Sequence, residues 1–420
     1  MRSETVNGRK QIVCWHGWAG DEAQALQRAV DVYNRSQTNV HVKMVSIAGS
    51  YEKMKIAFAG GDTPDVCSTV WGSEIVDYAI RDTLEPLDAY MKKDGFDVAQ
   101  YSGAIQNIFS YEGKTYALTQ GVATHFIFFN KRIFREVGLD PENPPKNTDE
   151  FNRAVALTTR YANNDPAQGL ERLGFPFAGR MFRLCIPFGV SYWDAETQTV
   201  FPNPDRLVAC LNWMKSNIDR VGWQKQQAFA AGFGNQVSPN NPFITGKVAM
   251  VEGGDWYASV IRQFAPADFE WGFFPLPAPA IGGKPNSTFL EGSMWVIPAA
   301  SRSKPEAWDF LKHITSAESI KMARLNPDVP SGVPPLRKMY DWPEYQKPFW
   351  KFTIGLIESP NALPPPEVPL FTTMIAEMER LEERVLSGDV PPEAGVEQFR
   401  KGIQAKVDEV LKSAGKLKAK

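Results

Sequence analysis

The sequence predicts an α/β protein with more than one domain. Its 420 residues exceed the roughly 250–300 that a single hydrophobic core usually serves, so we expect two domains. Hydrophobic residues make up 43% of the chain and charged residues 22%, which is a globular composition. The first part of the chain alternates strand-like and helix-like patterns. That alternation is typical of a parallel sheet covered by helices.

The N-terminal elements follow one another in a regular order. "QIVCW" (11–15) is a short apolar strand, and "DEAQALQRAVDVYNRS" (21–36) has apolar residues at helical spacing. "VHVKMVSI" (40–47) alternates like a half-buried strand. A helix over 51–61, ended by Gly-Gly, leads to the buried strand "DVCSTV" (65–70). Ligands of such sheets bind at the loops beyond the carboxyl ends of the strands, here "HGWAGD" and "WGSEI".

The later elements are less regular. Residues 114–134 contain strand-like runs, and a proline-rich loop leads to a helix with Thr148 or Asp149 as its cap. Residues 185–218 predict a turn, a hairpin and a helix that follows an Asn-Pro turn signal. "ITGKVAMVEGGDW" (244–256) repeats the order strand, glycines, helix, and Asp255 there suits a helix N-terminus. Most of the remaining chain is helical.

Composition excludes several classes of function. The net charge is −2 and no basic run occurs, which argues against nucleic acid or an anionic membrane surface as partner. No apolar stretch approaches the ~20 residues of a membrane span. The polar N-terminus lacks a signal peptide, so the protein is either cytosolic or has lost a targeting segment, and the second fits the awkward polar leader better.

Cysteine and histidine usage predicts neither a disulfide scaffold nor a metal site. Cys14 and Cys67 lie in apolar runs as buried thiols, whereas Cys185 and Cys210 could pair, which spacing alone leaves open. The four histidines are scattered without ligand spacing, so no zinc site is expected. We expect no metal and no cofactor.

Five phrases in register resemble the extracellular solute-binding proteins of bacterial ABC sugar importers, of the maltodextrin-binding type (family 1). They are "AGGDTPDV", "DTLEPLDAYMKKDGFD", "YEGKTYALTQGVATHFIFFNKRIFREVGLDPENPPKNTDEF", "FITGKVAMVEGGDW" and "MWVIPAASRSKPEAWDFLKHITS". The resemblance implies a type II periplasmic-binding-protein fold, α/β, with two hinge-linked lobes that each have a central sheet flanked by helices. The N-terminal lobe would comprise 1–122 and 293–330, and the C-terminal lobe 123–292 and 331–420. The ligand cleft would lie between them.

Hinge closure requires crossing segments that absorb backbone rotation. The candidates are Gly121–Thr124, Glu291–Ser293 and Ser331–Pro334, each with Gly or Pro beside small residues. The resemblance further implies a monomer that is not an enzyme, that binds a carbohydrate and that delivers it to the permease subunits of an ABC importer. The protein would be periplasmic or on the extracellular surface, without inserting into the membrane.

A sugar site combines aromatic platforms with converging polar groups. In the resemblance, Trp256 matches a ligand-stacking tryptophan, and the preceding Gly-Gly would let the chain turn so that the ring faces the cleft. Asp255, Glu291 and Gly292 are further candidates for contact with the ligand. The predicted ligand-binding residues are His16, Trp18, Trp71, Ser73, Glu74, Ala123, Thr124, Arg180, Phe182, Asp255, Trp256, Glu291 and Gly292.

Other ligands and one enzyme class remain open. Maltodextrin binders tend to place charged residues in the first loop, whereas this chain has His16 and Trp18 there. The departure implies a sugar other than maltodextrin, or a longer or less polar glycoside. The same fold could bind a glycerol-phosphate-type ligand, which favours basic clusters, or a polyamine, which favours carboxylates with aromatic rings. A glycoside hydrolase would require two carboxylates about 5–10 Å apart, for which Glu74, Asp255 and Glu291 are candidates.

Overall fold

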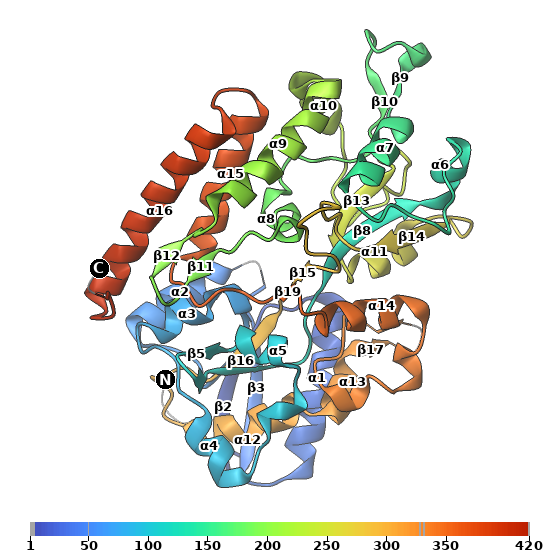
Figure 1. Ribbon diagram of the computed structural model, residues 1–420. Helices are drawn as coiled ribbons and strands as arrows, with labels where there is room; N and C mark the ends of the chain where they lie inside the picture. The colour runs from blue at the N-terminus through green and yellow to red at the C-terminus, as the bar shows by residue number, and fades with distance from the viewer. Residues whose placement is uncertain (1–4, 49, 327–328, 331, 419–420) are drawn as a thin grey trace. The chain divides into compact units, whose positions relative to one another are not determined.

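The chain divides into two compact units (Figure 1). The computed structural model describes residues 5–48, 50–326, 329–330 and 332–418. Unit 1 comprises Met1–Ala123, Leu290–Glu358 and Pro364–Phe371, and unit 2 comprises Thr124–Phe289, Ser359–Leu363 and Thr372–Lys420.

Two predicted crossing segments differ from this division. Glu291–Ser293 lies inside unit 1, just beyond the crossing after Phe289, and the segment Ser331–Pro334 does not link the units. The chain passes between the units after Ala123, Phe289, Glu358, Leu363 and Phe371. Of the predicted segment Ser331–Pro334, residue 331 lies outside the described residues and 332–334 lie inside unit 1. Backbone bridges hold this part of the chain there, because Val333 pairs with Val122 and Leu336 with Tyr101. Residues 332–358 therefore belong to unit 1 and not to the second lobe.

Unit 1 is built on a six-stranded sheet in the order β1-β2-β4-β16-β7, with β3 paired to β2. Its strands are β1 (Thr5–Val6), β2 (Arg9–His16), β3 (Val40–Ser46), β4 (Val66–Trp71), β7 (Ala117–Thr119) and β16 (Ser293–Val296). Strands β3, β2 and β4 are parallel, and β16 runs antiparallel to both β4 and β7. This arrangement confirms the predicted α/β class, and it brings the carboxyl ends of β2 and β4 to the same edge as the start of β16.

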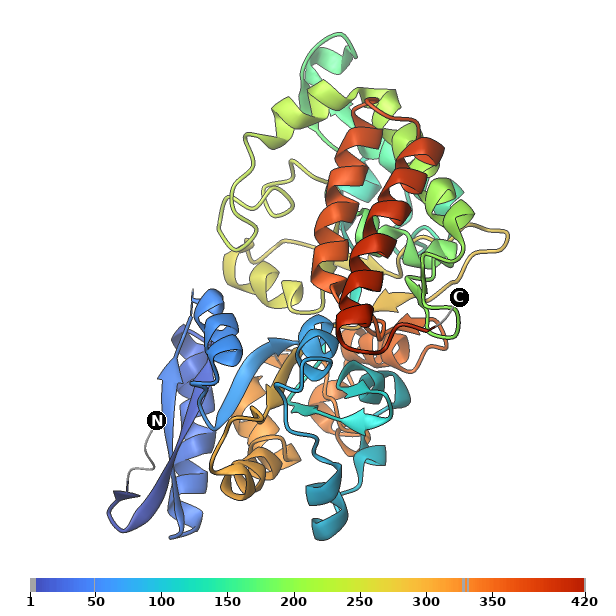
Figure 2. The ribbon, with the colours of Figure 1, turned by 90° about the vertical axis from the view of Figure 1, so that its left-hand side faces the viewer.

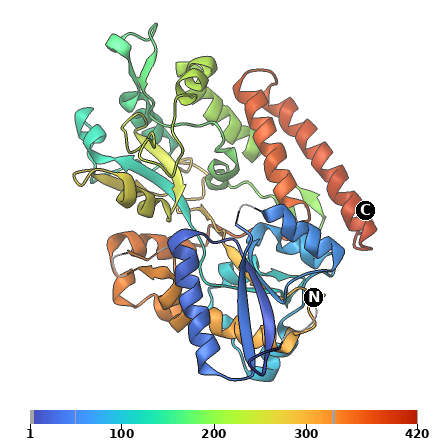
Figure 3. The ribbon, with the colours of Figure 1, turned by 180° about the vertical axis from the view of Figure 1, so that it is seen from behind.

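Helices cover the sheet of unit 1. They are α1 (Gly20–Ser36), α2 (Tyr51–Gly60), α3 (Ile75–Ala79), α4 (Asp88–Asp94), α5 (Gly103–Ile108), α12 (Lys304–Ile314), α13 (Ala317–Arg324) and α14 (Pro348–Ile357). Helix α1 buries Leu26, Ala29, Val30 and Tyr33, spaced three or four apart, and packs along β3, as the rear view in Figure 3 shows. Helix α2 is followed by Gly61 as its C-cap, whose φ of 72° suits glycine at a helix end.

Unit 2 is built on a three-stranded antiparallel sheet in the order β13-β8-β14. The strands are β8 (His125–Asn130), β13 (Met250–Gly254) and β14 (Trp271–Phe274). Every residue of the central strand β8 is buried, and Phe126, Phe128 and Phe129 join a cluster of aromatic rings. The abundance of phenylalanine in the sequence is thus largely core packing.

The helices of unit 2 surround this sheet. They are α6 (Lys131–Glu136), α7 (Thr148–Thr158), α8 (Met181–Leu184), α9 (Pro204–Val221), α10 (Trp223–Ala230), α11 (Tyr257–Phe264), α15 (Phe371–Leu386, which begins with the last residue of unit 1) and α16 (Pro392–Ser413). Helices α15 and α16 run side by side in Figure 2. The predicted hairpin is present, since β11 (Trp193–Asp194) pairs antiparallel with β12 (Thr199–Val200). Shorter elements are β5 (Ser110–Tyr111), β6 (Lys114–Thr115), β9 (Arg160–Tyr161), β10 (Leu170–Arg172), β15 (Thr288–Phe289), β17 (Leu325–Asn326), β18 (Val329–Pro330) and β19 (Ala362–Leu363).

Two local predictions need correction. The cap of α7 is Asn147 and not Thr148 or Asp149, because its side chain accepts hydrogen bonds from the backbone N–H groups of Asp149 and Glu150. Cys185 and Cys210 do not pair: the Cys185 thiol lies 3.1 Å from the Tyr192 hydroxyl, and the Cys210 Sγ lies 3.8 Å from the Met214 sulfur. Both thiols are buried, which raises their pKa values.

Candidate functional site

Eight of the predicted site residues lie in unit 1, at or next to the edge where β2 and β4 end. The start of β16 reaches this edge because Ser293 pairs with Trp71. Gly72 N–H donates to the carbonyl of Gly292 at 3.0 Å, and Ala123 bridges Glu291 through both of its backbone groups. The unit 1 set consists of His16, Trp18, Trp71, Ser73, Glu74, Ala123, Glu291 and Gly292.

Trp71 is exposed, and Glu74 holds the backbone beside it. The Trp71 side chain is 39% exposed although β4, which it ends, is otherwise buried. The Glu74 carboxylate accepts a hydrogen bond from Trp71 N–H at 3.1 Å and so fixes the turn beyond the strand. Burial raises the pKa of Glu74, and the nearby charges of Asp77 and Glu291 act in the same direction, whereas the Trp71 N–H and Lys55 oppose it. Glu74 and Glu291 thus interact at one edge.

The loop after β2 is held against β4 by Thr69. Gly17 N–H donates to the Thr69 Oγ1 at 2.7 Å, while Thr69 N–H donates to the Ser293 hydroxyl at 2.8 Å. A Cβ at Gly17 would lie 2.6 Å from the Thr69 methyl, so only glycine allows this approach. Thr69 itself has a φ of 79°, a left-handed conformation that is a true outlier for a β-branched residue. Such strain persists where the surroundings enforce it, often at ligand sites.

His16 and Trp18 flank Gly17 in this loop. His16 is buried, which lowers its pKa, and its Nδ1 has no hydrogen-bond partner among the described residues. Its imidazole is therefore neutral near pH 7. Trp18 is half-buried, and its carbonyl accepts from the Ser46 hydroxyl at 3.5 Å.

The other five predicted residues lie in unit 2, and three of them meet where β8 begins and β13 ends. Asp255 N–H donates to the carbonyl of Thr124 at 3.0 Å, directly beyond the pair of Gly254 with His125. The Asp255 carboxylate accepts from Trp256 N–H at 3.0 Å. Trp256, immediately before α11, is 39% exposed, whereas Thr124 is fully buried. The unit 2 set consists of Thr124, Arg180, Phe182, Asp255 and Trp256.

The glycines before Trp256 have a different role from the predicted one. Gly253 and Gly254 are the last residues of β13, and neither has a positive φ, so the chain does not require glycine in order to turn there. A Cβ at Gly254, however, would lie 2.3 Å from Nε1 of Trp256. The indole ring of Trp256 therefore packs directly against the backbone of Gly254.

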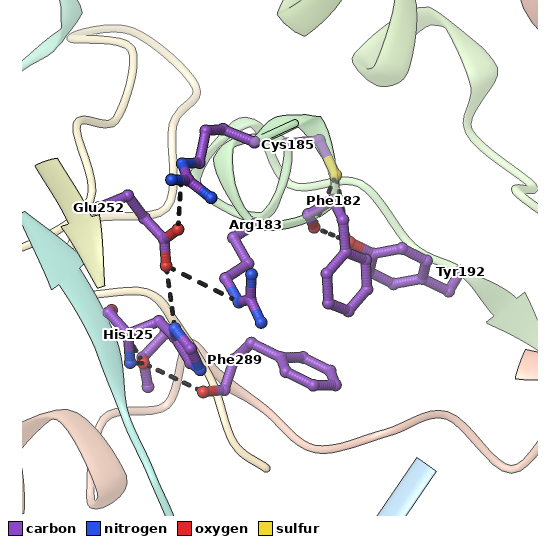
Figure 4. Close-up of polar contacts among 9 residues, drawn as sticks. His125, Phe182, Arg183, Cys185, Tyr192, Glu252 and Phe289 are labelled. Atoms are coloured by element: carbon purple, nitrogen blue, oxygen red, sulfur yellow. Dashed lines mark hydrogen bonds and ion pairs between the residues drawn. The ribbon is translucent and has the colours of Figure 1, made fainter. Parts of the chain in front are cut away.

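A buried charged cluster around Glu252, next to the end of β13, was not predicted from the sequence. Glu252, in β13, is 2% exposed, and its Oε1 lies 2.9 Å from Nδ1 of His125 (Figure 4). Nε of Arg183 approaches Oε1 at 3.7 Å, and Nε of Arg180 approaches Oε2 at 3.7 Å. Burial alone would raise the pKa of Glu252, but the His125 hydrogen bond and the positive charges of the arginines lower it to about 2. Glu252 is thus a carboxylate at neutral pH.

The segment that carries Arg180 is fixed by a carboxylate from α15. Glu382, which is buried, accepts hydrogen bonds from the N–H groups of Gly179, Arg180 and Met181 at 2.7, 3.3 and 3.1 Å. Phe182 follows on α8 and is buried too, with its ring edge-on to Phe289 at 4.8 Å. Phe182 therefore takes part in packing, and its ring is not an exposed platform.

The signals for the missed residues were weak in the sequence. Glu252 ends an apolar run in the sequence. A single acidic residue at such a position does not indicate a charged cluster, because its partners come from β8 and α8. Glu382 lies about two hundred residues away from the segment that it holds. Thr69 looks like an ordinary strand residue.

The described residues contain neither a membrane-spanning helix nor a group of side chains suited to a metal ion. No helix in this part of the chain is long and apolar enough to cross a membrane. Across the same residues, no three or more His, Cys, Asp or Glu side chains are grouped so that they could hold a metal ion.

Comparison with known proteins places the chain in a family. The family described as bacterial extracellular solute-binding protein matches residues 19–321, more than half of the chain. The protein therefore belongs to the bacterial extracellular solute-binding proteins, a family of binding proteins and not of enzymes, and the resemblance seen in its sequence is confirmed.

Curated relatives and solved structures agree with this placement. The sn-glycerol-3-phosphate-binding periplasmic protein UgpB of Salmonella typhi is 24% identical over 310 residues, 68% of this chain and 66% of that protein, just under two thirds. The structure of CpMnBP1 with mannobiose bound has a TM-score of 0.77 at 25% identity and covers 93% of this chain and 98% of its own. The sugar-binding protein MalE from Xanthomonas citri has a TM-score of 0.77 at 21% identity over 96% and 98%. The fold is thus that of the two-lobed type II periplasmic binding proteins.

Proposed function

We propose that this protein binds a carbohydrate, a mono- or oligosaccharide, and delivers it to the permease of an ABC importer. It would act as a monomer in the periplasm or at the extracellular surface, without catalysis and without a cofactor. The unit 1 set and the unit 2 set would contact the same ligand, and the units would close on it by rotation at the segments that link them.

The observation that carries this proposal is the pair Trp71 and Trp256. They are the tryptophans among the described residues whose side chains are exposed, each 39%. Each stands at the end of a strand of its unit, beside a carboxylate that fixes the backbone, Glu74 for Trp71 and Asp255 for Trp256. Flat aromatic faces beside fixed polar groups are what the C–H faces and hydroxyl rim of a sugar ring require.

Family membership and the solved relatives support the ligand class. CpMnBP1 holds mannobiose in its structure, and an ABC substrate-binding protein from Listeria monocytogenes (Lmo0181) holds cycloalternan. We extend to this chain the class of ligand and not its identity.

Calorimetric titration of the purified protein with mannobiose, maltotriose, glycerol and putrescine tests the proposal. We expect a saccharide to bind, to raise the melting temperature by mass action, and to be recovered chemically unchanged. Binding of putrescine without any saccharide would contradict the carbohydrate assignment. A saccharide recovered cleaved would contradict the proposal and show that the protein is a glycoside hydrolase.

A further inference from the structure

The pairing of β4 with β16 shifts by one residue just before Trp71. Between the partners of Val296 and Met294, β4 has two residues, Ser68 and Thr69, where β16 has one, which makes a β-bulge. After such a shift every later side chain lies on the other face of the sheet. The bulge therefore decides on which face the ring of Trp71 lies.

Thr69 is the residue of this bulge whose backbone is strained. Its φ of 79° lies in the left-handed region, which glycine adopts readily and which β-branched residues avoid. A glycine at this position would relax the backbone. The presence of threonine therefore has to be explained by its side chain, which is 4% exposed and so acts inside the protein.

The Thr69 hydroxyl holds the loop after β2 at a point where no backbone pair does so. The paired residues of β2 and β4 end with Trp15 and Cys67. Two residues further on, Gly17 N–H donates to Oγ1 of Thr69 at 2.7 Å. A Cβ at Gly17 would lie 2.6 Å from the Thr69 methyl and 2.9 Å from Oγ1, so the backbone of the loop lies directly on this side chain.

The backbone of Thr69 is fixed from the other side. Its N–H donates at 2.8 Å to the hydroxyl of Ser293, which is buried at the start of β16. Thr69 therefore connects three segments: the loop after β2, the end of β4 and the start of β16. His16 and Trp18 flank Gly17 in the first of these segments, and Trp71 ends the second.

We infer that Thr69 is a positioning residue of the ligand site: its hydroxyl holds residues 16–18 in place relative to Trp71 without touching the ligand. This rests on the proposed function and deepens it, because it names a residue through which two contact segments of unit 1 are kept in register. The strained backbone is retained because glycine, which would relieve it, offers no acceptor to Gly17 N–H.

Three variants at position 69 separate the hydroxyl from the shape of the side chain. Thr69→Ser keeps the acceptor and should bind mannobiose or maltotriose like the parent protein. Thr69→Val keeps the branched shape and Thr69→Gly relaxes the backbone, but neither accepts a hydrogen bond. Both should weaken binding by about fivefold or more in titration calorimetry, the scale of a hydrogen bond whose partly buried donor is left unsatisfied.

A matched control is available at another residue with positive φ. Asp82 has a φ of 52°, is exposed and lies in unit 1. Asp82→Gly introduces the same backbone change away from the site and should bind like the parent protein. If Thr69→Val does not fold, the comparison of Thr69→Gly with Thr69→Ser and with this control carries the test.

Hydrogen–deuterium exchange measures the positioning without any ligand. The peptide that spans residues 15–19 contains the Gly17 amide, which the Thr69 hydroxyl protects. We expect its exchange to become about tenfold faster in Thr69→Gly and Thr69→Val, and to stay at the parent rate in Thr69→Ser and Asp82→Gly.

A double variant tests the contact itself. Gly17→Ala should weaken binding in the parent protein, because its Cβ would overlap the Thr69 side chain. In the Thr69→Gly background the overlapping atoms are absent, so Gly17→Ala should cause little further loss. Losses that simply add would show that the two residues do not act through this contact.

The outcomes separate this inference from the proposed function. Saccharide binding that is unchanged in Thr69→Gly and Thr69→Val, or equally weak in Thr69→Ser, would overturn the positioning role and leave the carbohydrate function standing. A parent protein that binds neither saccharide would overturn the proposed function. In that case faster exchange in Thr69→Gly than in Thr69→Ser would still support the positioning role, and equal exchange would overturn it.

Discussion

Glu252 Oε1 and His125 Nδ1 lie 2.9 Å apart on adjacent strands, with both side chains almost fully buried. Because Glu252 is ionised, His125 is the donor. Breaking one partner of a buried charged cluster leaves the other charges uncompensated, which typically costs about 3–5 kcal/mol. We expect Glu252→Gln to lower the free energy of unfolding in urea by at least about 2 kcal/mol, with circular dichroism as the readout.

The control is a charged pair at the surface. Arg135 and Glu270 are 2.6 Å apart but about half exposed, so Arg135→Gln should cost at most about 1 kcal/mol. If Glu252→Gln were as stable as this control, the buried cluster would not contribute to stability in the way proposed.

The two exposed tryptophans predict a loss of affinity without a loss of stability. Trp71→Ala and Trp256→Ala should each weaken binding of the carbohydrate by roughly tenfold, the scale of one aromatic face at ~1.5 kcal/mol. Because both side chains are 39% exposed, the melting temperature of the free protein should change little. Titration calorimetry measures the first effect and a thermal melt the second.

A matched exposed apolar residue serves as control for the tryptophans. Ile281 is 92% exposed in unit 2, so Ile281→Ala should change neither affinity nor stability. Unchanged ligand affinity in both tryptophan variants would remove the main support for the carbohydrate site.

The sequence was sufficient for the fold class because the N-terminal elements carry strong local patterns. The strands 40–47 and 65–70 and the helix between them appear as β3, β4 and α2 within a residue or two. The positions of the candidate residues Trp71 and Asp255 at strand ends could be anticipated for the same reason, since β4 ends at Trp71 and β13 runs directly into Asp255. The assignment of residues 332–358 failed, because it depends on pairing with Tyr101 and Val122, more than two hundred residues earlier.

The charged cluster around Glu252 could not be predicted from the sequence for a similar reason. Glu252, His125 and Arg183 come from β13, β8 and α8, and nothing local to any of them indicates the other two. Phe182, which the resemblance implies as a ligand contact, is buried and packs against Phe289, a contact that only the fold brings about. Its contact with a ligand stays a prediction.

The fit between Gly254 and Trp256 predicts a difference between adjacent glycines. A Cβ at position 254 would lie 2.3 Å from the indole Nε1, whereas a Cβ at position 253 would be 3.4 Å from the nearest atom, in ordinary contact. Gly254→Ala should therefore displace the Trp256 ring and weaken ligand binding, while Gly253→Ala should retain affinity. Titration of both variants with the same saccharide measures this. Equal saccharide affinities of the two variants would show that the position of the Trp256 ring does not depend on glycine at position 254.

Glu382 predicts an unusual pH dependence of stability. Burial raises its pKa from 4.5 to about 7 in the folded chain, and the three backbone hydrogen bonds only partly oppose that shift. Between these two pH values the folded state binds more protons than the unfolded state. The free energy of unfolding contributed by this group therefore falls as pH rises through this window, by an amount on the order of 3 kcal/mol.

The variant Glu382→Gln isolates this contribution. It cannot ionise, so its own contribution to the slope is zero, although the loss of one acceptor for the N–H groups of 179–181 should cost about 1–3 kcal/mol at low pH. Burial lowers the pKa values of His16 and His313, which gives stability that rises with pH in an overlapping range. Those contributions are common to both proteins and cancel in the difference. We therefore expect the stability of the parent protein minus that of the variant, from urea unfolding at pH 5, 6, 7 and 8, to decrease from pH 5 to pH 7 and to level off toward pH 8. A constant difference would mean that Glu382 is ionised throughout and that its hydrogen bonds outweigh its burial.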